Sequence, residues 1–123
     1  MLVKIRLLDG SDAVIQSELV TRFRESHPPT VPPSVVIDFP PRRYASSEPL
    51  ETLFARFDPH LDLARLTTPA GTTVIVNADL VSSVIPPTNH HPDARAVITF
   101  LEGGDQQVRE TVAEAAAALG AAD

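Results

Sequence analysis

The chain has 123 residues, a formal net charge of −6 and no cysteine. These values fit one compact domain, exclude disulfides and thiolate metal sites, and disfavour nucleic acid, which is bound through clustered Lys and Arg side chains. No apolar run approaches the about 20 residues that cross a bilayer, so we expect a cytoplasmic protein without a membrane partner.

The first two strands are predicted from alternation and turn chemistry. Apolar and charged residues alternate from Val3 to Leu7, which is typical of a half-buried strand. Residues 9–12 ("DGSD") predict a turn, because Gly10 tolerates a positive φ. A returning strand is therefore expected at residues 13–16, followed by a single tight turn at residues 17–19.

Alternation resumes after that turn, at Val20 to Arg24. The period of two predicts a strand with Val20, Arg22 and Arg24 on one face and Phe23 on the other. Residues 26–34 come next and contain four prolines, which fix φ and remove backbone donors. We therefore expect an extended, stiff loop there rather than a strand.

A buried strand and a helix complete the first half. Val35 to Phe39 is the most apolar run, and "PPRR" (residues 40–43) separates it from a short strand expected near Tyr44. A helix is predicted next, with Ser47 or Glu48 as its N-cap and Pro49 in its first turn. Its expected buried stripe is Leu50, Leu53, Phe54 and Phe57.

The second half follows the same plan. Its expected strands are residues 64–67, 74–76, 81–85, 96–100 and 106–108. The sequence "EGGD", which contains Gly103 and Gly104, predicts a hairpin turn. Thr111 and Glu114 predict a capping box, Gly120 a helix end, and Val112, Ala115, Ala116 and Leu119 a narrow apolar stripe.

A shift of 61 residues aligns the two halves without a gap. "GSDAVIQSELV" (residues 10–20) then matches "GTTVIVNADLV" (residues 71–81), and "VVIDF" (residues 35–39) matches "AVITF" (residues 96–100). Chance similarity between two β-rich segments is the alternative to duplication. Duplication is the preferred hypothesis, because both blocks match at one offset.

These patterns together predict an α+β, mainly β protein of two tandem repeats. Each repeat, residues 1–61 and residues 62–123, is expected to form a small antiparallel meander or barrel-like sheet of about five strands, followed by one short helix. The two are expected to pack as one compact unit, because about 60 residues are marginal as a separate domain.

The second half resembles the small flagellar FlbD-like (swarming motility) family. The resemblance covers Leu63 to Leu119 and rests on "VNAD" in a Gly-bounded strand and turn, followed by "AVITF", a Gly turn and a short helix. It implies a non-enzymatic protein tied to motility or its regulation, and similar short sequences occur in phages and prophages. In the first half, residues 16–18 ("QSE") stand where the second half has "NAD". The family resemblance of the first half therefore depends on the internal duplication alone.

Within that resemblance, the polar and glycine residues are interpreted as structural. Asn77 and Asp79 are expected to organise a turn by bonding backbone amides, and Gly71, Gly103 and Gly104 to supply turn conformations. A ligand role for the first two would leave unexplained why only one half carries them. No cofactor is expected.

His90, His91 and Asp93 are weak candidates for a metal site. Imidazole and carboxylate groups suit zinc, but adjacent side chains in an extended loop point apart and no third partner is suitably spaced. Solvated loop residues are the favoured interpretation. Nothing in the chain matches a nucleophile elbow or a phosphate-binding loop, so no enzyme activity is expected.

Arg42, Arg43 and Tyr44, together with Arg56, are candidate partner-binding residues. With Arg22 and Arg24 they are expected to form a basic face for phosphate or an acidic partner. Residues 1–61 carry seven basic and eight acidic side chains, and residues 62–123 carry three and eight, so any phosphate-binding surface is expected in the first half. The alternative is a solvated strand edge whose charges prevent edge pairing. A protein partner is favoured over nucleic acid.

The sequence therefore predicts a structural or adaptor protein that acts through protein–protein contacts or self-association. A phage virion component, such as a capsid decoration or connector, is one setting, and the proline-rich loops at residues 26–34 and 86–93 are candidate contact sites. The alternative is an FlbD-like regulator of motility or transcription that binds a protein partner.

Overall fold

The computed structural model describes residues 1–25, 34–88 and 91–121. The first proline-rich loop, apart from Ser34, and His90 therefore lie outside the described residues. The predictions made for them stay predictions.

Among the described residues, each half contains five strands and one α-helix, with two 3-10 turns in the first half and one in the second. The first half holds β1 (Leu2–Arg6), β2 (Asp12–Gln16), η1 (Ser17–Leu19), β3 (Arg22–Glu25), β4 (Val35–Phe39), β5 (Arg42–Ser46), α1 (Leu50–Phe57) and η2 (Asp58–His60). The second holds β6 (Leu63–Thr67), β7 (Thr73–Asn77), η3 (Ala78–Leu80), β8 (Val81–Ile85), β9 (Ala96–Phe100), β10 (Asp105–Val108) and α2 (Val112–Ala118). The prediction of a mainly β protein with two short helices is confirmed.

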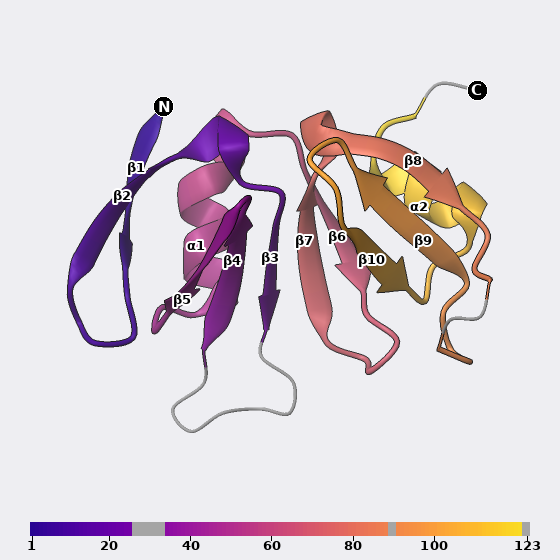
Figure 1. The fold of residues 1–123 in the computed structure, drawn as a ribbon, viewed down its shortest axis with the longest axis horizontal. Helices are drawn as coiled ribbons and strands as arrows, with labels where there is room; N and C mark the ends of the chain where they lie inside the picture. The colour runs from indigo at the N-terminus through magenta and orange to yellow at the C-terminus, as the bar shows by residue number, and fades with distance from the viewer. Residues whose placement is uncertain (26–33, 89–90, 122–123) are drawn as a thin grey trace.

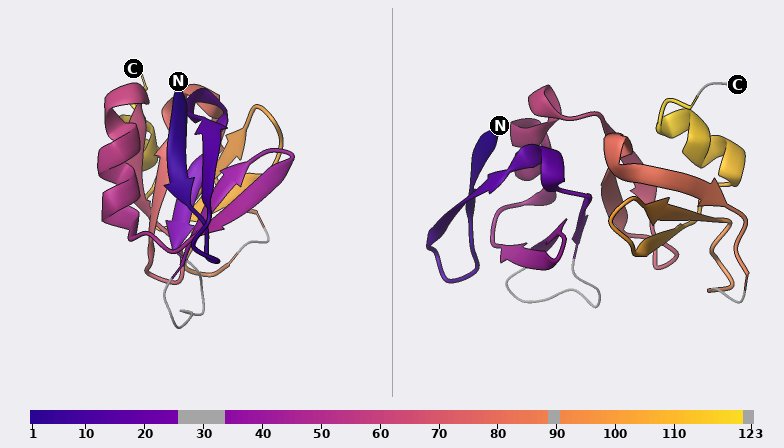
Figure 2. Two further views of the ribbon diagram at one scale, coloured as in Figure 1. Left: turned by 90° about the vertical axis from the view of Figure 1, so that its left-hand side faces the viewer. Right: turned by 45° about the horizontal axis from the view of Figure 1, so that its top comes forward.

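The strands form three antiparallel sheets. The central sheet has the order β5-β4-β3-β7-β6, and the other two are β1-β2 and β10-β9-β8. In Figure 1 the β1–β2 hairpin lies at one end of the long axis, while β8 and α2 lie toward the other. Both helices lie on the same side of the molecule (Figure 2).

The central sheet crosses the boundary between the halves. β3 of the first half pairs with β7 of the second, with Phe23 opposite Ile75. The expectation of a separate five-strand sheet in each half is therefore wrong. An alternating strand pattern indicates which face is buried, but it does not indicate which edge strand is the partner.

Two hydrophobic cores lie on opposite faces of β7. The first core contains α1, the β1–β2 hairpin and one face of the central sheet; its buried residues are Val3, Ile5, Ile15, Val20, Phe23, Val35, Ile37, Leu50, Leu53, Phe57 and Ile75. The second lies between the β6–β7 end of that sheet, the β8–β10 sheet and α2; its buried residues are Leu66, Val74, Val76, Ala96, Ile98, Phe100, Val108 and Ala115. Because strand side chains alternate, β7 contributes to both cores.

Two local predictions need correction. Val20 does not share a face with Arg22 and Arg24; it is fully buried in the first core. β3 begins at Arg22, after the 3-10 turn, so strand alternation starts two residues later than predicted. The N-cap of α1 is Pro49 rather than Ser47 or Glu48, and the Glu48 carboxylate instead accepts hydrogen bonds from Arg56.

The turn after β7 is organised by Asn77. Its Oδ1 accepts a hydrogen bond from the backbone N–H of Asp79 at 3.2 Å, and its Nδ2 donates to the carbonyl of Val20 at 2.9 Å. The second bond joins the two halves. Gly103 and Gly104 have φ values of 91° and 86° in the turn between β9 and β10, which only glycine adopts readily. Among the described residues, no helix is long and apolar enough to span a bilayer.

Candidate functional site

Three arginines lie on the face of the central sheet that is turned away from α1. Arg22 pairs with Asp38 across β3 and β4, and Asp38 pairs with Arg43 across β4 and β5. Directly opposed residues share a face, and Arg24 is two residues beyond Arg22, so all four side chains lie together. We call Arg22, Arg24 and Arg43 the arginine face.

Asp38 organises two of these arginines. Its Oδ2 accepts hydrogen bonds from the Nε atoms of Arg22 and Arg24, each at 2.8 Å, and its side chain is only 12% exposed. Burial alone would raise the pKa of Asp38, but the hydrogen bonds and positive charges of Arg24 and Arg22 outweigh burial and lower it. One carboxylate therefore holds two guanidinium groups at fixed positions.

Arg22 also reaches across to the second half. Its Nη1 donates to the carbonyl of Asp105 at 2.7 Å and to Oε1 of Gln106 at 2.8 Å. Its guanidinium lies 5.5 Å from the ring centroid of Phe100. These contacts leave Arg22 only 18% exposed, so it joins the halves and is less available to a ligand than its neighbours.

Arg24 and Arg43 are the more accessible members of the arginine face. The Arg24 side chain is 31% exposed, and Arg43 is exposed. Within the described part of the chain, the Arg43 side chain makes no ion pair or hydrogen bond. A ligand can therefore bind Arg43 without first displacing a protein carboxylate.

Two open hollows flank the arginine face. One, of about 190 Å³, lies toward the β9–β10 turn; its lining includes Arg22, Asp38, Arg42, Arg43, Phe100 and Gly103. The other, of about 520 Å³, lies toward the β6–β7 turn; its lining includes Arg22, Arg24, Thr68, Thr72, His91 and Gln107. Arginine, hydroxyl and amide groups thus follow one another along this surface, and the acids Glu25 and Asp105 also line the larger hollow.

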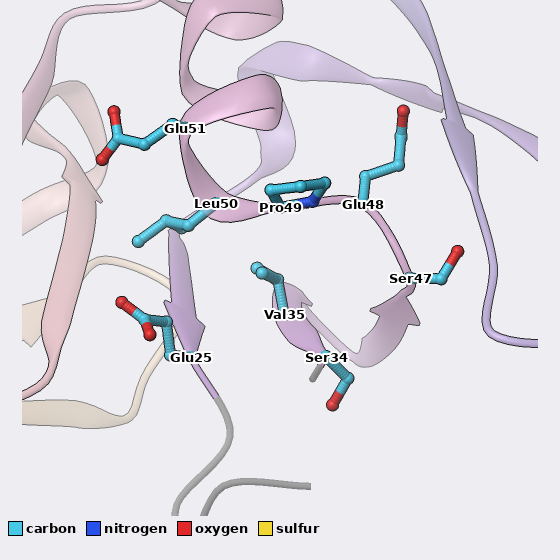
Figure 3. A pocket seen from close by; sticks show the side chains of 8 residues that line it. All are labelled: Glu25, Ser34, Val35, Ser47, Glu48, Pro49, Leu50 and Glu51. Carbon is cyan, nitrogen blue, oxygen red and sulfur yellow. The ribbon is translucent and has the colours of Figure 1, made fainter. Parts of the chain in front are cut away.

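A different hollow lies beside the start of α1 (Figure 3). Its volume is about 440 Å³, and its apolar lining is Val35, Pro49 and Leu50. Glu25, Glu48 and Glu51 also line it, and Glu48 and Glu51 are paired with Arg56 and Arg65. None of its described lining residues is basic, so this hollow offers no cation for phosphate and is unsuited to a polyanion.

The predicted partner-binding residues are not brought together as one group. Arg42 and Arg43 begin β5 and line the hollow beside Arg22. Tyr44 points to the opposite face and packs near Phe39, with ring centroids 6.0 Å apart. Arg56 lies on α1 and bonds both carboxylate oxygens of Glu48 at 2.6 Å, which lowers the pKa of Glu48.

The loop candidates for metal binding form no ligand set among the described residues. His91 Nδ1 accepts a hydrogen bond from the backbone N–H of Asp93 at 3.0 Å, which uses the nitrogen that faces the carboxylate. No group of three His, Asp or Glu side chains suited to a metal is found in residues 1–25, 34–88 and 91–121.

Sequence reasoning missed the role of Asp38. It lies in an apolar run, "VVIDF", where a single acid gives no indication of its partners. A charge at a buried-strand position does indicate that an opposite charge lies on an adjacent strand. This signal could have indicated Arg22 and Arg24, on the preceding strand, as partners of Asp38. The hydrogen bond from Arg22 to Gln106 depends on the packing of β10 beside β3. No pattern in the sequence predicts this packing.

Comparison with known proteins supplies a fold but no family. No family model matches the chain, and no curated protein matches it, so the FlbD-like and phage resemblances gain no support. A solved structure that does match is the LytTr DNA-binding domain of a putative methyl-accepting/DNA response regulator from Bacillus cereus. The match has a TM-score of 0.61 at 14% identity and covers 94% of this chain and 91% of that chain.

The chain therefore has a LytTr-like fold. This likeness contradicts the prediction of a structural or adaptor protein, because the matching domain is a DNA-binding domain. It likewise overturns the ranking of a protein partner or self-association above nucleic acid. That ranking relied on the net charge of the whole chain, which conceals three arginines gathered around one aspartate.

Proposed function

We propose that this protein binds double-stranded DNA through the arginine face. The observation that carries the proposal is the grouping of Arg22, Arg24 and Arg43 around a single carboxylate on a solvent-facing sheet surface. The LytTr-like fold supports it independently, since the matching solved domain is described as DNA-binding. The proposed role is binding without catalysis.

The arginine face has the chemistry that a phosphate backbone requires. Duplex DNA carries about one negative charge per 1.7 Å of its axis, and guanidinium groups bind phosphate oxygens through paired hydrogen bonds. Asp38 cancels one of the three positive charges and fixes the direction of two guanidinium groups. Fixed donors lose less conformational entropy on binding than free side chains do.

The negative net charge sets how this binding should behave. Phosphate contacts depend on local cations, whereas long-range attraction depends on the field of the whole molecule. A chain of net charge −6 is therefore expected to associate slowly and to bind more weakly as salt rises. Hydroxyl and amide groups in the flanking hollows are positioned to contact base edges or sugars.

The proposal is tested by removing a cation that stabilises nothing else. In Arg43→Gln the fold should be retained, because the side chain is exposed and unpaired among the described contacts. We expect weaker binding to all duplexes and a slope of log affinity against log salt reduced by about one. Fluorescence anisotropy on duplexes selected from a random-sequence pool measures both values.

Arg65→Gln is the matched control. It removes the same charge from an exposed position, but Arg65 lies on the α1 side of the sheet, paired with Glu51 and stacked 4.4 Å from the Phe54 ring centroid. DNA binding by this variant should equal that of the unchanged protein. Equal losses in Arg43→Gln and Arg65→Gln would refute the arginine face as the binding surface, and failure to select any duplex would refute DNA binding itself.

We also infer that the two halves descend from one duplicated unit. The bounds of β6, β7, η3 and β9 are those of β1, β2, η1 and β4 with 61 added to each residue number. Turn hydrogen bonds follow the same shift, from Leu7 N–H to Ser11 O in one half and from Thr68 N–H to Thr72 O in the other. Related chains should keep this match between halves, and its loss in them would count against duplication.

A further inference from the structure

β2 and β8 are edge strands of two different sheets, and their unpaired edges are complementary. β2 pairs only with β1, and β8 pairs only with β9, within the part of the chain that the structure describes. β3 and β7, which occupy the corresponding places 61 residues away, pair with each other at the junction between the halves. The β3 and β7 edges are thus paired with each other, whereas the equivalent edges of β8 and β2 have no partner among the described residues.

The edge at β8 opens onto an apolar groove. The groove has a volume of about 340 Å³ and lies between β8 and α2, lined by Val81, Val84, Val112 and Leu119. At the corresponding place in the first half, Phe23 packs on Phe57 of α1 with ring centroids 4.9 Å apart. There Ile75 of β7 covers the contact, and Phe23, Phe57 and Ile75 are all fully buried.

The edge at β2 carries the residue that would cover this groove. Val14 lies 61 residues before Ile75, and its side chain is 59% exposed. On β8, Val84 lies 61 residues after Phe23 and lines the groove. An exposed apolar strand edge is usually avoided in a monomer, because its free N–H and C=O groups pair with other chains. Val14 and Val84 thus stand where the internal junction buries Ile75 and Phe23.

We propose that a second copy of this chain docks its β2 edge onto β8, and that Val14 fills the β8–α2 groove. The occupant is a second copy because β2 is the counterpart of β7, the strand that closes the same position internally. Transferred by 61 residues, the internal register opposes Ser83 with Ile15, Val84 with Val14, and Ile85 with Ala13. This inference goes beyond DNA binding and does not depend on it.

The contact joins different surfaces of the two copies. The β1–β2 hairpin and β8 lie toward opposite ends of the long axis (Figure 1), so one molecule cannot close the contact on itself. Head-to-tail contacts of this kind leave a free edge at each end and extend into chains as concentration rises. Each contact between copies would then repeat the geometry of the β3–β7 junction.

Sedimentation equilibrium of the protein without DNA tests the proposal. The average mass should rise with concentration up to about 1 mM. Val14→Lys, at an exposed position, and Ala116→Lys, on the α2 wall of the groove, should remain monomeric because a charge would enter the groove. Leu101→Lys is the control: Leu101 is 61% exposed but lies outside both edges, so this variant should associate like the unchanged protein.

Mixing the Val14→Lys and Ala116→Lys variants gives the decisive measurement. Val14→Lys keeps an intact groove and Ala116→Lys keeps an intact β2, so an equimolar mixture should form dimers and nothing larger. A mixture that stays monomeric, single variants that still associate, or an unchanged protein that is monomeric throughout would each overturn the proposal.

A cross-link checks the register. The chain has no cysteine, and directly opposed residues on antiparallel strands lie about 4.5–5.5 Å apart between Cα atoms, which a disulfide spans. Val14→Cys mixed with Val84→Cys should give a disulfide-linked pair on mild oxidation, whereas Val14→Cys with Ser82→Cys should not. Equal yields from both mixtures would overturn the transferred register.

Discussion

At the scale of single residues, Asp38 makes the arginine face stable as well as ordered. It is 12% exposed and accepts hydrogen bonds from Arg22 and Arg24, so its removal leaves two guanidinium groups without their partner. We expect Asp38→Asn to lower the free energy of unfolding by about 1–3 kcal/mol near neutral pH. Urea denaturation measures this, with Asp62→Asn, at an exposed position, as a control that should change little.

The same residue predicts a pH dependence. Because the folded-state pKa of Asp38 is lowered, its stabilisation is fully present above the ordinary aspartate pKa of about 4 and is lost as pH falls through the folded-state value. The difference in unfolding free energy between Asp38→Asn and the unchanged protein should therefore shrink as the pH is lowered from about 4 toward about 2. A difference that stays constant over this window would contradict the prediction.

Sequence reasoning identified cations better than it identified their partners. Arg42 and Arg43 were singled out as part of a basic face expected in the first half of the chain. Their separation from Arg56 could not be predicted, because α1 packs on the face of the sheet opposite the arginine face. The role of Asp38 depends on strand pairing, which places residues 14 and 16 positions apart within hydrogen-bond distance.

At the scale of elements, local chemistry decides where α2 begins. The Thr111 hydroxyl accepts a hydrogen bond from the backbone N–H of Glu114 at 3.1 Å, and the Glu114 carboxylate accepts one from the backbone N–H of Thr111 at 3.0 Å. Thr111→Ala should lower the unfolding free energy by about 0.5–2 kcal/mol, because one N-terminal N–H loses its partner. Thr111→Ser keeps the hydroxyl and should stay near the unchanged value in thermal denaturation; an equal loss in both variants would exclude capping as the cause.

Elements were predictable because their determinants lie within a few residues of one another. The capping box, the glycine turn at Gly103 and the alternation of β1 depend only on neighbours along the chain. The start of β3 was misplaced because the 3-10 turn gives Val20 a direction that a continuous strand would not. The pairing of β3 with β7 joins residues 50 to 54 positions apart, and period-two patterns do not specify such a partner.

At the scale of the whole molecule, β7 makes the two halves one cooperative unit. Ile75 is buried in the first core while Val74 and Val76 are buried in the second, so neither core survives if β7 separates from β3. The side-chain bond from Asn77 to the Val20 carbonyl and those from Arg22 to Asp105 and Gln106 reinforce the junction. Residues 1–61 and 62–123 are therefore expected to unfold together.

Substitution of Ile75 tests this coupling. Ile75→Ala removes a fully buried side chain from the first core and should cost about 2–5 kcal/mol. Tyr44, the single tyrosine, lies in β5 and reports on the first half by fluorescence, while hydrogen exchange of the Ile98 amide reports on β9 in the second. Both probes should show the same loss and the same denaturation midpoint, because a two-state unit has one transition.

Leu101→Ala, at an exposed site, should leave both unchanged. If Ile75→Ala shifts the tyrosine transition but leaves exchange at Ile98 unaltered, the halves unfold separately and β7 does not couple them.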